Sequence, residues 1–371
     1  MIEEFEAQYN NRYQILKGLK AQGKRLIGWV CTYVPEEIIH AAGMHPFRIV
    51  GRESDTPLAN AYLYSNICSF TRSCLEEGLN RNLSFMDGLV TTNTCDHIRR
   101  LYDVWFKYID TPYKKILAQP CTTSQSCLSY FKQEFIQFRE ELQRHFQVEI
   151  TDTALKESIK LFNHMRSLLK RLYLLRKLDP PPISGEEVCQ VVMAGMVLPK
   201  EGYITLLESL LKRLESRQPL SPKNGQPRLM VIGSELDNPI YIKIIEDSGT
   251  LVVADDLCCG SRYFWDLVEE DKDPIEALAV RYLTKMPCAR MHPSSSRVLL
   301  LKTLAQEFNV EGVIYQSIKF CDLHAGIFPV IKAGFDDLGI PVLKLEREYL
   351  LAGAGQTKTR IQAFLEMLKE Q

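Results

Sequence analysis

Short apolar runs alternate with longer amphipathic stretches along much of this chain. Runs of about four to eight apolar residues with few polar positions are typical of strands buried on both faces of a parallel sheet. The run at residues 310–321 ends in a cysteine and is followed by a helical stretch and then a Gly-Ile-Pro turn. By the same criterion we expect strands at residues 26–30, 45–51, 87–91, 116–119, 228–233, 249–254 and 342–345.

Between these runs, apolar residues recur at helical spacing. A helix at residues 35–43 is marked by Pro35 at its start, by Glu36 and Glu37 in its first turn and by Gly43 at its end. Residues 129–217 are almost entirely helical in pattern, and we interpret their apolar stripes as packing surfaces. Further helices are expected at residues 1–24, 66–79, 96–108, 240–247, 274–283, 298–308 and 357–368.

Strands that alternate with helices predict an α/β fold with parallel sheets. A chain of 371 residues is long for one core, so we expect more than one domain. The segment 219–227, which is rich in Pro, Ser and Gly, is the best linker candidate. The prediction is an N-terminal α/β domain at 1–128, a helical region at 129–222 and a C-terminal α/β domain at 223–371.

Composition and charge narrow the class of protein. The chain is 46% hydrophobic and 25% charged, which is typical of globular proteins, and its formal net charge is −1. A balanced charge gives no support to nucleic-acid binding, and no apolar run is long enough to predict a membrane span. The acidic N-terminus lacks the apolar core of a signal peptide, so we expect a cytoplasmic protein.

The cysteines carry the candidate chemistry. The chain has 11, and no two of them form a CxxC pair, so any metal site must be assembled from distant segments. Cys31, Cys95, the pair Cys258 and Cys259, and Cys321 follow expected strands, and Cys68 opens an expected helix. At such corners helix N-termini favour the thiolate form that binds zinc or an iron–sulfur cluster. The alternative is that these thiols are small buried core residues.

Other kinds of site receive less support. A cysteine nucleophile needs a histidine base, and none of the seven histidines has a diagnostic signature. The chain carries neither of the glycine-rich motifs that bind dinucleotides or ATP. Glu36 and Glu37 read as helix-start carboxylates and are weak candidates for a general acid or base.

Several of these stretches, taken together, resemble the family of 2-hydroxyacyl-CoA dehydratase and benzoyl-CoA reductase subunits. Each stretch is weak alone, but they occur in order across nearly the whole chain. They are CTYVPEEIIHAAG (31–43), NICSF (66–70), DGLV (87–90), TCD (94–96), DDLCCGSRY (255–263), GVI (312–314), FCD (320–322) and GQTKTRIQAFLE (355–366).

The resemblance implies two flavodoxin- or Rossmann-like domains with parallel sheets plus a helical region. It also implies a 4Fe-4S cluster between the domains, held by Cys68, Cys95 and Cys321, with one iron left open. Some relatives carry a larger double-cubane cluster instead, for which Cys31, Cys74, Cys258, Cys259 and Cys288 could supply further ligands.

The resemblance further implies a related sister subunit or a homodimer, and a separate ATP-hydrolysing iron–sulfur activator that injects low-potential electrons. The implied reaction is radical dehydration, or ring reduction, of an acyl-CoA thioester. Two other hypotheses stay open: a non-catalytic electron-relay subunit whose partner binds the substrate, and a zinc-binding α/β protein.

Overall fold

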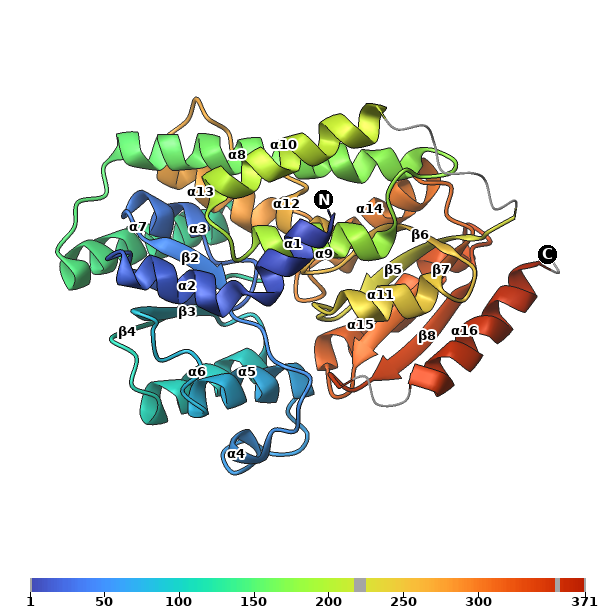
Figure 1. Cartoon of the computed structure of the whole chain (residues 1–371), viewed down its shortest axis with the longest axis horizontal. Helices are drawn as coiled ribbons and strands as arrows, with labels where there is room; N and C mark the ends of the chain where they lie inside the picture. The colour runs from blue at the N-terminus through green and yellow to red at the C-terminus, as the bar shows by residue number, and fades with distance from the viewer. Residues whose placement is uncertain (1, 217–224, 351–353, 370–371) are drawn as a thin grey trace.

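Two parallel four-stranded sheets form the centre of the molecule, as the computed structural model shows for residues 2–216, 225–350 and 354–369 (Figure 1). The first sheet contains β1 (Leu26–Trp29), β2 (His45–Arg48), β3 (Gly88–Thr92) and β4 (Tyr113–Leu117). The second contains β5 (Arg228–Gly233), β6 (Leu251–Asp256), β7 (Gly312–Ile318) and β8 (Val342–Arg347).

Both sheets have the same topology. Their strand orders are β2-β1-β3-β4 and β6-β5-β7-β8. In each sheet the first strand of the chain is an interior strand, the second is the edge strand beside it, and the third and fourth lie on its other side. This is the beginning of the flavodoxin-like order. The predicted fold class of two such α/β domains is confirmed, and the shared order makes the two halves alike in a way that the sequence did not reveal.

Helices cover both sheets. Those in the first half are α1 (Ile2–Asn10), α2 (Arg12–Ala21), α3 (Glu36–Ala41), α4 (Pro57–Asn60), α5 (Ser69–Leu79) and α6 (Asp96–Tyr108). Those that follow β5 are α11 (Pro239–Glu246), α12 (Ser261–Phe264), α13 (Pro274–Thr284), α14 (Ser294–Glu307), α15 (Asp322–Asp336) and α16 (Ala354–Lys369).

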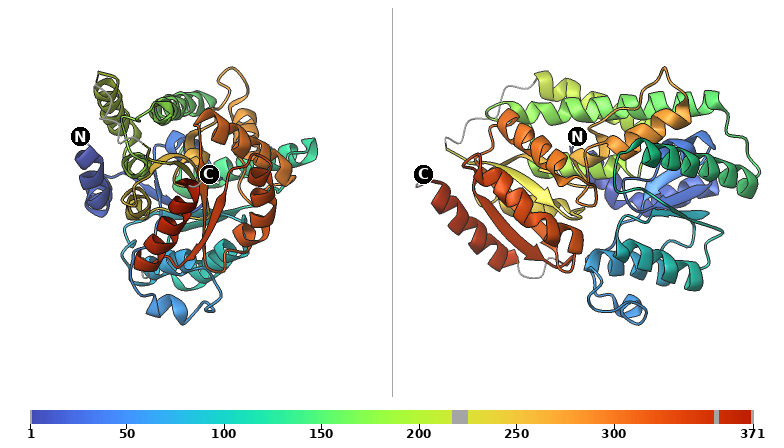
Figure 2. Two further views of the ribbon diagram at one scale, coloured as in Figure 1. Left: turned by 90° about the vertical axis from the view of Figure 1, so that its right-hand side faces the viewer. Right: turned by 180° about the vertical axis from the view of Figure 1, so that it is seen from behind.

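The expected helical region joins the two halves. It contains α7 (Gln125–Phe146), α8 (Asp152–Leu174), a 3₁₀ turn (Leu175–Lys177), α9 (Gly185–Gly195) and α10 (Lys200–Ser216). Helix α8 contacts α3 of the first half and α12 and α13 of the second, while α9 contacts α1, α11 and β6. In Figures 1 and 2, α8 and α10 run along one side of the molecule. The predicted boundary after residue 128 stays a prediction, and the one after 222 lies outside the described residues.

Strand β4 lies three residues earlier than expected. The strand was predicted at residues 116–119 but is formed by Tyr113–Leu117, whose middle residues include Lys114 and Lys115. An edge strand tolerates such half-buried lysines because its outer side faces solvent. The short helices α4 and α12 were not predicted, since four residues give no measurable periodicity.

No helix in the described ranges combines the length and the apolar character needed to cross a membrane.

Gly233, the last residue of β5, is required by close packing. Its φ is +151°, and a Cβ atom there would lie 1.7 Å from the backbone oxygen of Gln316 on β7. Its own carbonyl oxygen accepts a hydrogen bond of 2.8 Å from Arg262. No side chain fits without separating two central strands.

We therefore expect Gly233→Ala to lower the free energy of unfolding by about 3 kcal/mol, because it adds both backbone strain and a clash with main-chain atoms. Urea unfolding followed by circular dichroism measures the change. Gly202→Ala is the matched control: Gly202 lies in α10 with no atom near its missing Cβ, so this change should add about 0.5 kcal/mol. Equal stabilities for the two variants would contradict the packing argument.

Candidate functional site

Cysteines gather where the carboxyl ends of the strands of both sheets meet. Cys31 follows β1, Cys95 follows β3, Cys258 follows β6 and Cys321 follows β7. In open parallel sheets, binding sites form outside these strand ends. The predicted corner positions are therefore where the structure places them.

Three of the cysteines share one structural position, the residue immediately before a helix. Cys68 is the N-cap of α5, Cys95 that of α6 and Cys321 that of α15. Free N–H groups and the positive end of the helix dipole stabilise negative charge there. The Cys95 sulfur accepts a hydrogen bond of 3.4 Å from the Ile98 amide, and the Cys68 sulfur lies 3.1 Å from Thr71 Oγ1.

The structure brings Cys68, Cys95 and Cys321 together from two domains. Burial raises the pKa of all three thiols, that of Cys321 to about 12. Negative charge on Cys68 raises the pKa of both Cys95 and Cys321, and charge on Cys321 raises that of Cys95. The three sulfur atoms are thus close enough to repel one another when ionised.

His97 lies beside all three segments. Its Nδ1 accepts a hydrogen bond of 3.2 Å from the Cys68 amide, and it follows Cys95 by two residues. Its Nε2 lies 4.0 Å from Asp322 Oδ2, the residue after Cys321. A single imidazole ring therefore connects the first domain's two cysteine turns with the second domain's cysteine turn.

Three cysteine thiols are the donor type that holds iron–sulfur clusters. Among the described residues, no three His, Cys, Asp or Glu side chains are placed to hold a single ion. A cubane of four irons and four sulfides is wider than one ion, so its thiolates stand farther apart. Bound metal also supplies the positive charge that three mutually repelling thiolates lack.

A second group of thiols lies nearby. Cys31 has a positive φ of 83°, and its sulfur accepts a hydrogen bond of 3.3 Å from Thr94 Oγ1. Burial raises the pKa of Cys258, and negative charge on Cys288 raises it further. Of the two other candidates, Cys74 is fully buried within α5, and the Cys259 thiol donates to Glu235 Oε1 at 2.8 Å.

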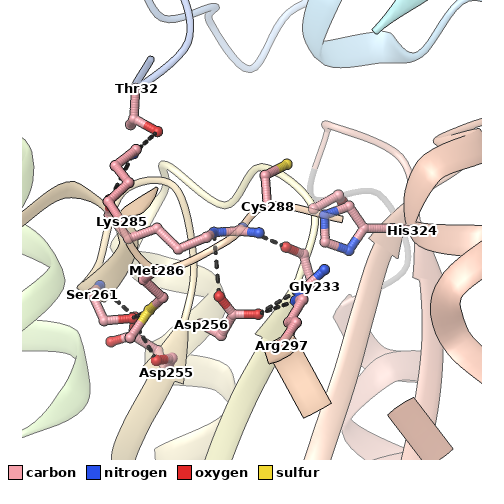
Figure 3. A network of polar contacts seen from close by, with 12 residues as sticks. Thr32, Gly233, Asp255, Asp256, Ser261, Lys285, Met286, Cys288, Arg297 and His324 are labelled. Carbon is pink, nitrogen blue, oxygen red and sulfur yellow. Dashed lines mark hydrogen bonds and ion pairs between the residues drawn. The ribbon is translucent and has the colours of Figure 1, made fainter. Parts of the chain in front are cut away.

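A buried polar network supports the second domain's side of this site (Figure 3). Asp256, at the end of β6, binds Arg297 and lies 3.4 Å from Arg262 Nε. The Lys285 ammonium group donates to the Arg262 backbone oxygen and to Thr32 Oγ1, both at 2.9 Å. Thr32 follows Cys31 in the first domain and Lys285 belongs to the second, so this contact joins the two domains.

An ion pair also crosses the junction. Arg48, at the end of β2, binds Glu235 at 2.8 Å, and its guanidinium lies 5.1 Å from the centre of the Trp29 ring. Sequence reasoning missed the roles of Arg48, Arg262 and Lys285. The stretch DDLCCGSRY was a usable signal for Arg262, since it places an arginine six residues after an acid at the end of an expected strand.

Glu36 and Glu37 are buried at the start of α3. Glu36 lies 3.2 Å from Lys200 Nζ, and burial raises its pKa. Burial also acts to raise the pKa of Glu37, but Arg166 and Tyr282 hold the carboxylate and leave its pKa lowered. These contacts join α3 to α8, α10 and α13, and an acid–base role for either residue stays a prediction.

Comparison with known proteins now decides the family. Residues 31–368 match the protein family described as 2-hydroxyglutaryl-CoA dehydratase, D-component. The chain belongs to this family. The match covers the three N-cap cysteines and every strand except β1, so the resemblance drawn from the sequence motifs is confirmed.

Curated relatives agree with this assignment. The chain is 26% identical to the (R)-phenyllactyl-CoA dehydratase beta subunit of Clostridium sporogenes, covering 97% of this chain and 96% of that one. It is 30% identical to one of the subunits of benzoyl-CoA reductase from Thauera aromatica, covering 81% and 79%. It is 28% identical to the beta subunit of (R)-2-hydroxyglutaryl-CoA dehydratase from Acidaminococcus fermentans, covering 99% of each. This protein is thus of the same enzyme type as the subunits of 2-hydroxyacyl-CoA dehydratases and benzoyl-CoA reductases.

A buried tyrosine connects the second domain to the Cys68 turn. The Tyr349 hydroxyl donates to Asp237 Oδ2 at 2.7 Å, and its amide donates to Ser69 Oγ at 2.8 Å, one residue after Cys68. Burial and the negative charge of Glu235 raise the pKa of Asp237 to about 6, against the opposing effects of Tyr349, Arg48 and Arg347.

The Asp237 pKa gives a prediction for stability against pH. Its pKa in the folded chain exceeds the value of about 3.9 in an unfolded one, so the folded state binds the proton more tightly. The stability that this group contributes is complete below about pH 4 and is lost as the pH rises through about 6. Asp237→Asn should remove that loss, as measured by urea unfolding at several pH values between about 4 and 7.

The exposed Asp247, which pairs with Lys243 on the surface, provides the control. Asp247→Asn should leave the wild-type pH dependence in place. If the curves for Asp237→Asn and the wild type run parallel across this range, the buried carboxyl does not cause the change.

Proposed function

We propose that this protein is the iron–sulfur subunit of an acyl-CoA enzyme of the 2-hydroxyacyl-CoA dehydratase or benzoyl-CoA reductase type. One observation carries the proposal: three helix N-cap thiols from two domains converge in a member of this family. Cys68, Cys95 and Cys321 are the proposed ligands of a 4Fe-4S cluster. Three thiolates leave one of the four irons without a protein ligand.

Such a cluster supplies one-electron chemistry at low potential when it is bound. The residues of this chain would bind the cluster and shield it from water. The helix N-termini stabilise the thiolates, burial keeps water from them, and His97 fixes the turns on which they stand. The buried side chains of Arg48 and Arg262 place positive charge beside the site.

The proposed reaction needs partners. As the family resemblance implies, the low-potential electron comes from a separate ATP-dependent activator protein. The absence of an ATP-binding motif in this sequence fits that division of labour. The relatives are themselves named as single subunits of their enzymes, which supports a complex with a related sister subunit, or else a homodimer. The proposed substrate is an acyl-CoA thioester, which undergoes radical dehydration or ring reduction in the cytoplasm.

The second thiol group favours one alternative. Cys31, Cys258 and Cys288 lie beside the first three, so a double-cubane cluster within a single chain is the second candidate function. A relay subunit, whose partner binds the substrate, would use the same three ligands. Metal content distinguishes the cluster types, and activity of this chain alone with an activator would contradict a pure relay.

Iron and sulfide analysis after anaerobic purification tests the ligand set. We expect about four irons per chain for one cubane and about eight for a double cubane. Cys321→Ala should lose the brown chromophore and most of the iron, because only two thiolates would remain. Cys189→Ala, in α9, is the matched control and should keep the full iron content.

Unchanged iron in Cys321→Ala, or loss of iron in Cys189→Ala, would refute this ligand set. Zinc without iron in the wild type would refute the cluster itself.

A further inference from the structure

One loop of the second domain crosses to the first and contacts three of its strand ends. We call residues 285–293, which connect α13 to α14, the crossing loop. Its first contact is that of Lys285 with Thr32, after β1. At its other end, the His292 amide donates to the Cys121 oxygen, after β4, at 2.8 Å. Between them, the Cys288 amide donates to the Tyr33 hydroxyl at 3.3 Å.

Arg290, at the centre of the crossing loop, binds the turn that carries Cys95. Its Nη1 donates to the backbone oxygens of Asn93 at 3.2 Å and of Thr94 at 3.3 Å. Its Nε donates to Gln119 Oε1 at 2.9 Å, and its Nη2 to the Gln119 backbone oxygen at 2.5 Å. The guanidinium thus joins the ends of β3 and β4 immediately before Cys95.

The chemistry of these contacts explains the choice of residue. A guanidinium group carries five N–H donors in one rigid plane and can hold several carbonyl oxygens at fixed angles. All four acceptors are neutral oxygen atoms, so the contacts give direction and position more than charge neutralisation. A lysine at this place has one nitrogen and cannot reach all four.

The other hydrogen bonds of Asn93, at the start of this turn, come from the first domain. The Asn93 amide donates to the Leu117 oxygen at 3.0 Å, and the Gln119 amide donates to Asn93 Oδ1 at 2.9 Å. Both contacts stay within the first sheet. Only Arg290 among these partners belongs to the second domain, which also carries Cys321.

We propose that Arg290 is a positioning residue that sets Cys95 of the first domain against Cys321 of the second. The effect on cluster binding rests on the proposed iron–sulfur function, whereas the contact between Arg290 and the Cys95 turn does not depend on it. Loss of the guanidinium frees two carbonyl groups directly before Cys95. The crossing loop then no longer holds the Cys95 turn, and one of the three proposed ligands is less firmly held in place.

The test uses the full-length, cluster-loaded protein and its Arg290→Gln variant. Hydrogen exchange followed by mass spectrometry should show roughly tenfold faster exchange at residues 93–98 in the variant, with residues 66–74 unchanged. Iron release to a chelator should be roughly tenfold faster, and the electron paramagnetic resonance line shape of the reduced protein should change. Arg290→Lys should give intermediate values, because it keeps one donor group at this position.

Arg360→Gln is the matched control. Arg360 donates to the Lys344 backbone oxygen at 2.8 Å within the second domain, so its loss should alter none of these measurements. Unchanged exchange at residues 93–98 in Arg290→Gln would overturn the proposed contact. Faster exchange with unchanged iron release and line shape would overturn the positioning role. A wild type without iron would instead refute the proposed function, while the exchange experiment would still test the crossing loop.

Discussion

The structure depends on one constraint, the burial of charged side chains where the carboxyl ends of the strands of the two sheets meet. Parallel strands direct all their following loops to one edge, and here two such edges face each other. Arg48 pairs with Glu235 across the junction, while Asp256 lies between Arg262 and Arg297. Buried ion pairs add little net stability because desolvation opposes them, but the loss of one partner is costly. The Arg48–Glu235 pair, which crosses the junction, therefore favours one relative arrangement of the domains over others.

That fixed arrangement gives the cysteine site its form. No segment of the chain contains two of the three converging thiols at close spacing, so their geometry depends on both domains. Tyr349 holds the Cys68 turn from one side, and Arg290 holds the Cys95 turn from the other. His97 lies between these turns and the start of α15. The arrangement of the three thiols is thus a property of the domain junction more than of any single motif.

Much of this was accessible from the sequence, for reasons that are local. Apolar runs placed most of the strands, and the strand-to-helix corner positions of Cys95 and Cys321 followed from a strand that gives way to a helical pattern. The motif resemblance gave the grouping of Cys68 with the other two. The lysines of β4 obscured that strand, since a half-buried edge strand has neither an apolar run nor clear alternation. Arg290, Tyr349 and Lys285 could not be found, because their contacts with the first domain join residues more than a hundred positions apart.

The raised pKa values of the three thiols bear on how the site would take up metal. In a buried site, ionising one thiol opposes ionisation of the next, so the protonated forms are favoured without metal. A cluster binds thiolates, so its insertion must release those protons and is coupled to pH. The N-cap positions lower this cost, since the amide groups are already oriented toward the developing charge. Helix termini and bound metal would therefore both offset the cost of ionising neighbouring buried thiols, which is a physical reason for the proposed ligands to lie at three helix starts and not within the strands.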